Sequence, residues 1–299
     1  MLLGERVAIV TGAGGGLGRS HAHFLARHGA KVVVNDLNPE AARTVAEEIQ
    51  SAGGEALNFA ASVTDEAAVS AMVADTIERW GRIDIFINNA GILRDKSFAK
   101  MSLDDFRLVV DVHLMGSVIC TQAVWQIMRD QEFGRIVLTT SSSGLYGNFG
   151  QANYGAAKMA LVGLMQTLAI EGEKYGIRVN CLAPTAATQM TAGILTQETL
   201  ETLAPEFVSP GLLALVEPDA PTRTILCAGA GHFARANVTL THGTFVGVGD
   251  DAGEQVIREW NEISDRDAEI VPDYGFAQSE REVASAAAAN IVKASVGGC

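Results

Sequence analysis

A short apolar strand that runs straight into a glycine-rich turn opens the chain, and this feature most constrains its fold. Residues 6–10 have a strand pattern, Thr11–Gly18 contains five glycines, and a helical pattern follows to His28. Such a unit points the N–H groups at a helix start toward a pyrophosphate, and glycines let the backbone approach it closely. The turn therefore predicts dinucleotide binding, with Gly12, Gly16, Leu17 and Gly18 as contacts.

The second strand pattern, residues 31–35, ends at Asp36. A carboxylate at this distance beyond the glycine turn can accept hydrogen bonds from both ribose hydroxyls of an adenosine, and it would repel a phosphate on that ribose. Neither Gly15 nor Leu37, the neighbours best placed to bring in a cation, is basic. Asp36 therefore predicts NAD rather than NADP, unless it only begins a loop or caps the helix that starts at Pro39.

Strand and helix patterns then alternate along most of the chain. The expected strands also include residues 55–60, 83–87, 135–139 and 178–182, and the expected helices are residues 17–28, 39–52, 65–80, 102–129 and 153–174. Alternation of this kind predicts right-handed crossovers and a parallel sheet with helices on both faces. The predicted fold class is therefore α/β, a Rossmann-type doubly wound parallel sheet in a single domain with a C-terminal extension.

The pattern loosens after Pro184. Residues 185–221 mix Thr, Pro and Leu, which suits a substrate lid at the carboxyl end of the sheet. We expect a catalytic core over residues 1–228 and an extension over residues 229–299. Within the extension, residues 252–263 have a helical pattern, and Ser279–Glu282 has the pattern of a capping box that starts an alanine-rich helix toward Lys293.

The stretch from Ser141 to Lys158 carries the candidate chemistry. On a helix, Tyr154 and Lys158 are four residues apart and share one face, so an ammonium can sit close to a phenol. A neighbouring cation favours the phenolate, which would bring Tyr154 into range as a general base. Ser141, at the carboxyl end of the expected strand 135–139, adds a hydroxyl beside the substrate oxygen. The alternative for the Tyr–Lys pair alone is a solvated helix face.

Composition excludes several other functions. A formal net charge of −13 argues against nucleic acid or an anionic membrane as the main partner. No uninterrupted apolar stretch is long enough to span a bilayer, and the N-terminus has no basic leader, so we expect a cytoplasmic protein. The four cysteines show no paired spacing, and His21 and His23 point different ways on a helix, so no metal site is predicted.

These motifs, in this order and spacing, resemble the short-chain dehydrogenase/reductase family. The resemblance rests on the Thr11–Gly18 turn, Asn88–Gly91, Ser141, Tyr154 with Lys158, and Pro184. It implies that Ser141, Tyr154 and Lys158 are catalytic, and that the cofactor is contacted by Asn89, Ala90, Gly91, Tyr154, Lys158, Pro184 and Thr188. His113 stands where most family members have an active-site Asn, and as a further catalytic candidate it would join the proton relay behind Lys158; the alternative for His113 is helix packing. For Asn88–Gly91, the alternative from the residues alone is an ordinary turn.

Within the family, residues 91–98, 112–114, 143–154 and 169–172 resemble the (3R)-hydroxyacyl-CoA dehydrogenase branch, found in peroxisomal multifunctional enzymes of type 2 and also classed among 17β-hydroxysteroid dehydrogenases. The implied reaction is NAD-dependent oxidation of a secondary alcohol in an acyl-CoA thioester, by a homodimer or homotetramer. Two alternatives are a 17β-hydroxysteroid dehydrogenase and a catalytically silent dinucleotide-binding regulatory protein. CoA phosphates call for cations, yet residues 179–222 contain none, so Arg94, Lys96 and Lys100, or Arg235, would have to supply them.

Overall fold

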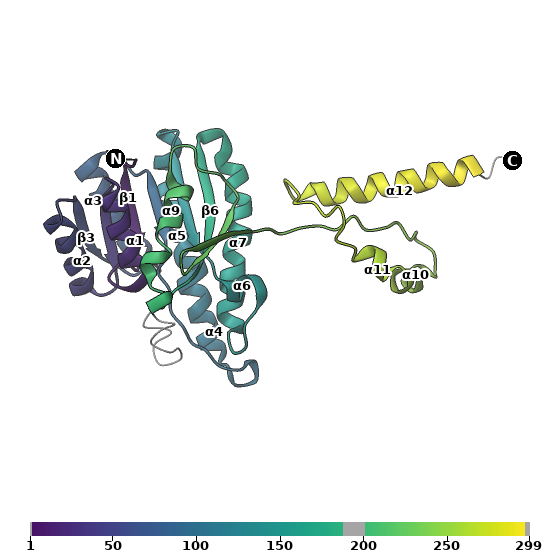
Figure 1. Ribbon diagram of the computed structural model, residues 1–299, viewed down its shortest axis with the longest axis horizontal. Helices are drawn as coiled ribbons and strands as arrows, with labels where there is room; N and C mark the ends of the chain where they lie inside the picture. The colour runs from purple at the N-terminus through teal and green to yellow at the C-terminus, as the bar shows by residue number, and fades with distance from the viewer. Residues whose placement is uncertain (1, 188–200, 297–299) are drawn as a thin grey trace. The chain divides into compact units, whose positions relative to one another are not determined.

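The computed structural model describes residues 2–187 and 201–296 of the chain (Figure 1). The chain divides into two compact units, Met1–Ala236 and Asn237–Cys299. The first unit contains the sheet and all the candidate site residues that are described, and the second unit is helical.

An eight-stranded sheet forms the centre of the first unit. Its strands are β1 (Val7–Thr11), β2 (Lys31–Asp36), β3 (Ala56–Ala60), β4 (Ile85–Asn88), β5 (Gly134–Thr139), β6 (Ile177–Thr185), β7 (Ile225–Gly229) and β8 (His232–Ala236). They lie in the order β3-β2-β1-β4-β5-β6-β7-β8. Strands β1 to β7 pair in parallel, and only β8 is antiparallel to its neighbour. The predicted doubly wound sheet is confirmed, with its switch point between β1 and β4.

Helices follow the strands at the positions that local sequence signals indicate. They are α1 (Gly16–Arg27), α2 (Pro39–Ser51), α3 (Glu66–Trp80), α4 (Leu103–Val110), α5 (Gly116–Asp130), α6 (Ser142–Tyr146), α7 (Ala152–Gly172) and α9 (Pro210–Val216), with short turns η1 (Phe98–Lys100), η2 (Asp111–Met115), η3 (Glu173–Tyr175) and η4 (Pro205–Phe207). The side chain of Asp65 accepts a hydrogen bond from the Ala68 N–H, so Asp65 is the N-cap of α3. Gly81, with φ of 72°, ends the same helix.

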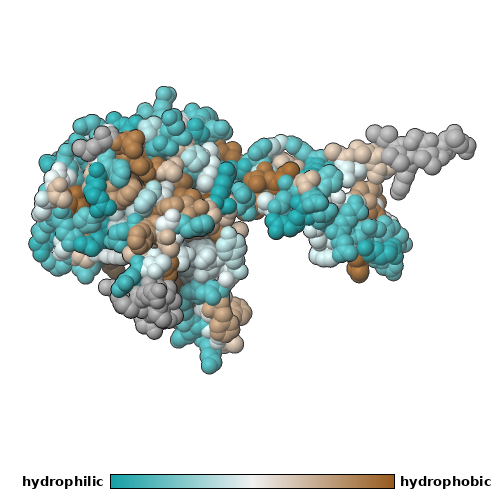
Figure 2. All heavy atoms as spheres, in the orientation of Figure 1, coloured by the Kyte–Doolittle hydropathy of each residue, from teal (hydrophilic) through white to brown (hydrophobic). Residues whose placement is uncertain are grey.

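Successive strand residues pack alternately into two separate hydrophobic cores, one on each face of the sheet. Ala8 and Val10 of β1 pack with α1, α2 and α9, whereas Ile9 packs with α3, α5 and α7. Strands buried on both faces explain why residues 7–10 are uniformly apolar. Hydrophilic residues cover much of the outer helices α2 and α3 at the left of the view (Figure 2).

The helix expected over residues 102–129 contains a wider turn. Helices α4 and α5 are joined through η2, which is a π-helical turn that includes His113. Such turns occur mostly as single-turn bulges inside α-helices, often at functional sites. The combined helix Leu103–Asp130 is long and apolar enough, by length and composition alone, to cross a membrane. Its Cys120, Val124 and Met128 are fully buried in the core beside the sheet.

The second half of the expected lid belongs to the core. Val208, Leu212 and Leu215 are at most 1% exposed. Ser209 accepts or donates hydrogen bonds at 2.7 Å to Ser20 Oγ and 2.8 Å to His21 Nδ1, which joins this segment to α1. Residues 205–216 therefore pack as a fixed element, and residues 188–200 of the lid lie outside the described residues.

The sheet extends beyond the core boundary expected at residue 228. A tight turn with Ala230 at φ 49° and Gly231 at φ 73° returns the chain as β8, which pairs with β7 from Gly229–His232 to Ile225–Ala236. Positive φ at both central positions is the turn geometry that closes two-residue hairpins. The compact unit accordingly runs to Ala236.

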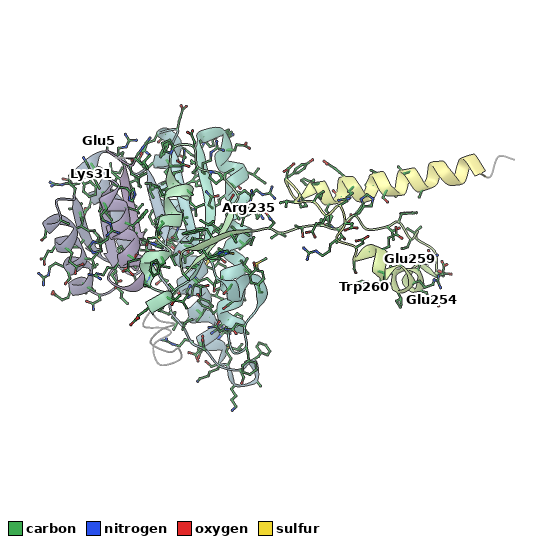
Figure 3. All side chains as sticks on the ribbon, in the orientation of Figure 1. Glu5, Lys31, Arg235, Glu254, Glu259 and Trp260 are labelled. Carbon is green, nitrogen blue, oxygen red and sulfur yellow. The ribbon has the colours of Figure 1, made fainter. Side chains whose placement is uncertain are left out.

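The second unit contains α10 (Ala252–Arg258), α11 (Trp260–Ile263) and α12 (Phe276–Val296), with Glu254, Glu259 and Trp260 on or between the first two (Figure 3). Helical structure was expected over residues 252–263, and it forms two short helices there. The expected capping box at Ser279 was wrong, because α12 already begins at Phe276. The Ser279 hydroxyl instead donates to the Phe276 carbonyl at 3.0 Å, inside the first turn of the helix.

Candidate active site

The glycine turn between β1 and α1 is closely fitted to the end of β4. Gly12 has φ of 62°, and a Cβ there would lie 2.8 Å from the Ala90 Cα. A Cβ at Gly18 would overlap the Gly12 carbonyl oxygen. Among the described residues no side chain caps α1 at its N-cap Gly15, whose surroundings are open. The first N–H groups of α1 are thus available to an anion, as a pyrophosphate site requires.

Asn89 and Thr11 hold this turn against β4. The Thr11 hydroxyl accepts from the backbone N–H groups of Asn89 at 3.0 Å and Ala90 at 3.1 Å. The Asn89 side-chain amide donates to the carbonyls of Thr11 at 3.0 Å and Gly12 at 3.2 Å. Asn89 therefore shapes the glycine turn through its side chain, and the Thr11 hydroxyl, at the start of that turn, holds it to the end of β4.

Asp36 lies at the carboxyl end of β2, beside the same turn. Its Oδ2 accepts from the Gly14 N–H and its Oδ1 from the Asn38 N–H, both at 2.9 Å. The helix-capping alternative for Asp36 is excluded, because the N-cap of α2 is Asn38, whose side chain accepts from Glu40 and Ala41 N–H groups. The partly exposed carboxylate is thus anchored next to the start of α1.

Ser141, Tyr154 and Lys158 converge beyond the carboxyl end of β5. Ser141 is the N-cap of α6, where its Oγ accepts from the Ser143 N–H at 3.2 Å. The Lys158 Nζ is buried, donates to the Thr139 carbonyl at 2.5 Å, and lies 5.6 Å from the centroid of the Tyr154 ring. The Thr140 hydroxyl donates to the Lys158 carbonyl at 2.6 Å, so α7 is fastened to the strand that delivers Ser141.

The pKa of the Tyr154 phenol differs from the expectation that the Lys158 ammonium would lower it and so favour the phenolate. Burial raises the pKa of the Tyr154 phenol, and nearby Asp95 raises it further, while a hydrogen bond with Ser141 acts in the opposite direction. Burial also lowers the pKa of Lys158 to about 7. The expected depression of the phenol pKa is therefore wrong for the unliganded chain, because the ammonium itself is desolvated and is bound to the Thr139 carbonyl.

His113 contacts Tyr154 from the π-helical turn. The two rings pack edge to face, with centroids 5.2 Å apart and planes at 88°. Its Nε2 lies 2.8 Å from the Ile92 carbonyl and 3.0 Å from the Ile92 N–H. Burial first, and then Lys158, lower the pKa of His113 to about 3, so its ring is neutral at physiological pH. Its Nδ1 is buried without a partner among the described residues.

The loop after β4 is tied to the segment that precedes Tyr154. The Asn153 side chain donates to the Arg94 carbonyl at 3.1 Å and accepts from the Tyr154 N–H at 2.7 Å. The Gln151 side chain donates to Asp95 Oδ2 at 2.7 Å. Sequence reasoning missed Asn153, Gln151 and Asp95, since contacts across more than fifty residues leave no local signal.

A family model described as short chain dehydrogenase matches residues 6–199. The chain belongs to the short-chain dehydrogenase family. The predicted family is thus confirmed, and the protein is an oxidoreductase by membership. Pro184 lies at the carboxyl end of β6 and pairs with Ala228. Thr188 lies outside the described residues.

Relatives of this dehydrogenase include large multifunctional enzymes. Peroxisomal multifunctional enzyme type 2 of Drosophila melanogaster is 51% identical over 214 residues, which are 69% of this chain and 35% of that protein. The full-length structure of that Drosophila enzyme matches 94% of this chain and 49% of its own, with 37% identity and a TM-score of 0.78. The dehydrogenase therefore spans less than half of this relative.

Two other proteins match it over nearly their whole length. A short-chain type dehydrogenase/reductase of Mycobacterium tuberculosis is 43% identical over 271 residues, 87% of this chain and 94% of that protein. A structure of 7α-hydroxysteroid dehydrogenase with NADH and 7-oxo glycochenodeoxycholic acid matches 77% of this chain and 94% of its own, with 32% identity and a TM-score of 0.71. A nicotinamide dinucleotide is thus the cofactor class in a solved neighbour.

Proposed function

We propose that the protein is an NAD-dependent dehydrogenase that oxidises the secondary alcohol of a (3R)-hydroxyacyl-CoA thioester to a ketone. The observation that carries this proposal is the convergence of Ser141, Tyr154 and Lys158 beyond β5, next to the glycine turn that Asn89 fastens to β4. A hydroxyl, a phenol and an amine gathered at the carboxyl end of a doubly wound sheet suit proton transfer with a bound dinucleotide.

The residues present fit a nicotinamide dinucleotide. The N–H groups at the start of α1 suit its pyrophosphate, and the close approach of Gly12 and Gly18 to their neighbours leaves no room for side chains in the cradle. The Asp36 carboxylate suits two ribose hydroxyls and would repel a phosphate, which favours NAD over NADP. When bound, NAD supplies the acceptor for the hydride that leaves the alcohol carbon.

The side chains of the chain itself move the proton. In oxidation, Tyr154 Oη takes the proton of the substrate hydroxyl, and the Ser141 hydroxyl donates a hydrogen bond to the same substrate oxygen. Lys158, when protonated, stabilises from its buried position the Tyr154 phenolate that accepts this proton and so becomes a neutral phenol. The pKa of the Tyr154 phenol is raised, so the fraction of Tyr154 present as phenolate grows as the pH increases toward that pKa. The oxidation rate should therefore increase with pH.

The substrate assignment is supported by two lines. The motifs of the loop after β4 and of residues 143–154 resemble the (3R)-hydroxyacyl-CoA dehydrogenase branch. The multifunctional relative from Drosophila shares 51% identity over the matched part. The neighbour solved with a steroid supports a hydroxysteroid as the second candidate.

The test is NAD reduction with a panel of (3R)- and (3S)-hydroxyacyl-CoA esters of several chain lengths, together with 17β- and 7α-hydroxysteroids. We expect turnover with the 3R thioesters and a higher kcat/KM with NAD than with NADP. Turnover confined to steroids would replace the leading assignment with the second, and equal turnover of 3S and 3R esters would contradict the stereochemistry.

A further inference from the structure

The loop between β4 and α4 carries two lysines with no ion pair among the described residues. Lys96 and Lys100 are exposed, and neither contributes to a salt bridge there. The neighbouring charges are committed, since Arg94 lies 3.8 Å from Asp105 and Asp95 accepts from Gln151. On a chain with a net charge of −13, two unpaired ammonium groups near the active site are a local attraction for an anion.

Backbone hydrogen bonds position the loop that carries these lysines relative to Tyr154. The Lys96 N–H donates to the Gly150 carbonyl at 2.9 Å, and the Arg94 carbonyl accepts from Asn153, the residue before Tyr154. Lys100 ends the η1 turn, whose start is closed by a hydrogen bond from the Lys100 N–H to the Ser97 carbonyl at 2.8 Å. The backbone of the loop is therefore held against the segment that leads into Tyr154.

Exposed aromatic side chains accompany the lysines. Phe98 is 76% exposed in the same loop, and Phe149 is 90% exposed next to Gly150. Nothing in the fold of the described residues buries either ring, although each is large enough to fill a core position. A flat aromatic face beside cations is the arrangement that proteins use to stack a nucleobase and neutralise its phosphates.

Arg235, the other cation expected to serve CoA, is at the wrong end of the sheet. It pairs in register with Leu226 near the start of β7, whereas the carboxyl end of β7 pairs with His232. Figure 3 shows it on the edge strand β8. Lys31 is also remote from the site, because it begins β2 and pairs with Glu5 at 3.4 Å at the amino end of the strands (Figure 3).

We propose that Lys96 and Lys100, together with Phe98 and Phe149, bind the nucleoside diphosphate end of the acyl-CoA substrate. The ammonium groups neutralise phosphates as point charges, and the phenyl rings stack on the adenine. This inference rests on the proposed function. It assigns a binding site to the phosphates of the substrate, for which residues 179–222 supply no cation.

The experiment compares two thioesters of one (3R)-hydroxyacyl group, its CoA ester and its N-acetylcysteamine ester, which has no phosphate and no adenine. In Lys96→Glu/Lys100→Glu we expect kcat/KM for the CoA ester to fall about tenfold or more, mainly through a higher KM. Added salt should lower kcat/KM of this variant less steeply than that of the wild type. The N-acetylcysteamine ester should lose less than about twofold, given the few tenths of a kcal/mol typical of surface changes. Arg235→Glu reverses a single charge at the other end of the sheet and should leave kcat/KM for both esters unchanged.

Equal losses with both esters, or a loss confined to the CoA ester in Arg235→Glu, would overturn the inference. Binding of free CoA provides a readout independent of turnover. If the wild type oxidises neither ester, the proposed function fails, and the inference stands only if free CoA binds the wild type and binds the double variant about tenfold more weakly. Phe149→Ala should weaken free CoA binding as well, and unchanged binding there would remove the ring from the site.

Discussion

Tyr154 is the residue through which the proposed proton transfer passes. Tyr154→Phe removes the acceptor and keeps the ring that packs against His113. We expect kcat to fall by about 10² to 10⁴, the usual contribution of a general base, while the dissociation constant of NAD stays within a small factor. Steady-state kinetics and fluorescence titration with NAD measure the two effects. Substantial turnover by this variant would contradict the assigned role.

Asp95 raises the pKa of the Tyr154 phenol by its charge, so its removal has a predictable sign. Asp95→Asn retains an oxygen for the Gln151 hydrogen bond and loses the carboxylate. The phenol pKa should fall, and the rise of the oxidation rate with pH should move to lower pH. The pH dependence of kcat/KM for wild type and variant tests this, with Asp104→Asn as a control from the same region. A shift to higher pH would show that another group controls the profile.

Asp36 determines the cofactor preference in the proposed function. Asp36→Ala removes the charge that would repel a ribose phosphate, so the ratio of kcat/KM for NAD to that for NADP should fall by tenfold or more, the equivalent of about 1.4 kcal/mol. The same variant also removes the acceptor of the Gly14 N–H, so kcat/KM should fall somewhat with both cofactors. An unchanged ratio would refute the role of Asp36.

At the scale of elements, the turn between β1 and α1 offers a matched pair of glycines. In Gly18→Ala the new Cβ overlaps the Gly12 carbonyl and lies 2.6 Å from the Asn89 amide, whereas a Cβ at Gly15 meets nothing within 4 Å. We expect the free energy of unfolding to fall by roughly 1–3 kcal/mol in Gly18→Ala, as for overpacked sites, and by at most about 1 kcal/mol in Gly15→Ala. Urea unfolding of the unliganded variants measures both, and equal losses would count against a close fit between this turn and the end of β4.

At the scale of the whole molecule, two buried imidazoles link stability to acid. Burial lowers the pKa of both His21 and His113 to about 3 from an ordinary 6.5. Between these values the unfolded chain binds more protons than the folded one, so stability is lost as the pH falls from about 6.5 toward 3. Each histidine contributes up to about 1.4 kcal/mol per pH unit within that window.

His113→Asn should therefore show a shallower loss of unfolding free energy between pH 6.5 and 4 than the wild type. Denaturant unfolding at several pH values gives the two slopes, and comparing slopes removes any constant destabilisation caused by the substitution. His23→Asn, which removes a partly buried imidazole that pairs with Glu48, is the control. Identical slopes for His113→Asn and wild type would show that His113 is protonated as easily in the folded chain as in the unfolded one.

Much of the sheet and of the site followed from local sequence signals. The short apolar runs of the strands and the glycine turn depend on neighbours in the chain, and the structure has them where they were expected. The edge-to-face contact of His113 with Tyr154 and the Asp95–Gln151 hydrogen bond depend on how a loop and two helices meet in space. No residue pattern reports that, and for the same reason the desolvation that raises the Tyr154 pKa was missed.

The π-helical turn at Asp111–Met115 has a consequence for the length of the chain. Each residue of an α-helix advances about 100° around the axis, so deleting one residue to restore ordinary bonding would rotate everything on one side of the deletion relative to the other. Either His113 would turn away from Tyr154, or Cys120, Val124 and Met128 would turn out of the core. The contact of His113 with Tyr154 and the core packing of α5 together fix the number of residues in this helix. We therefore expect that insertions or deletions of a kind that surface loops tolerate would not be tolerated here.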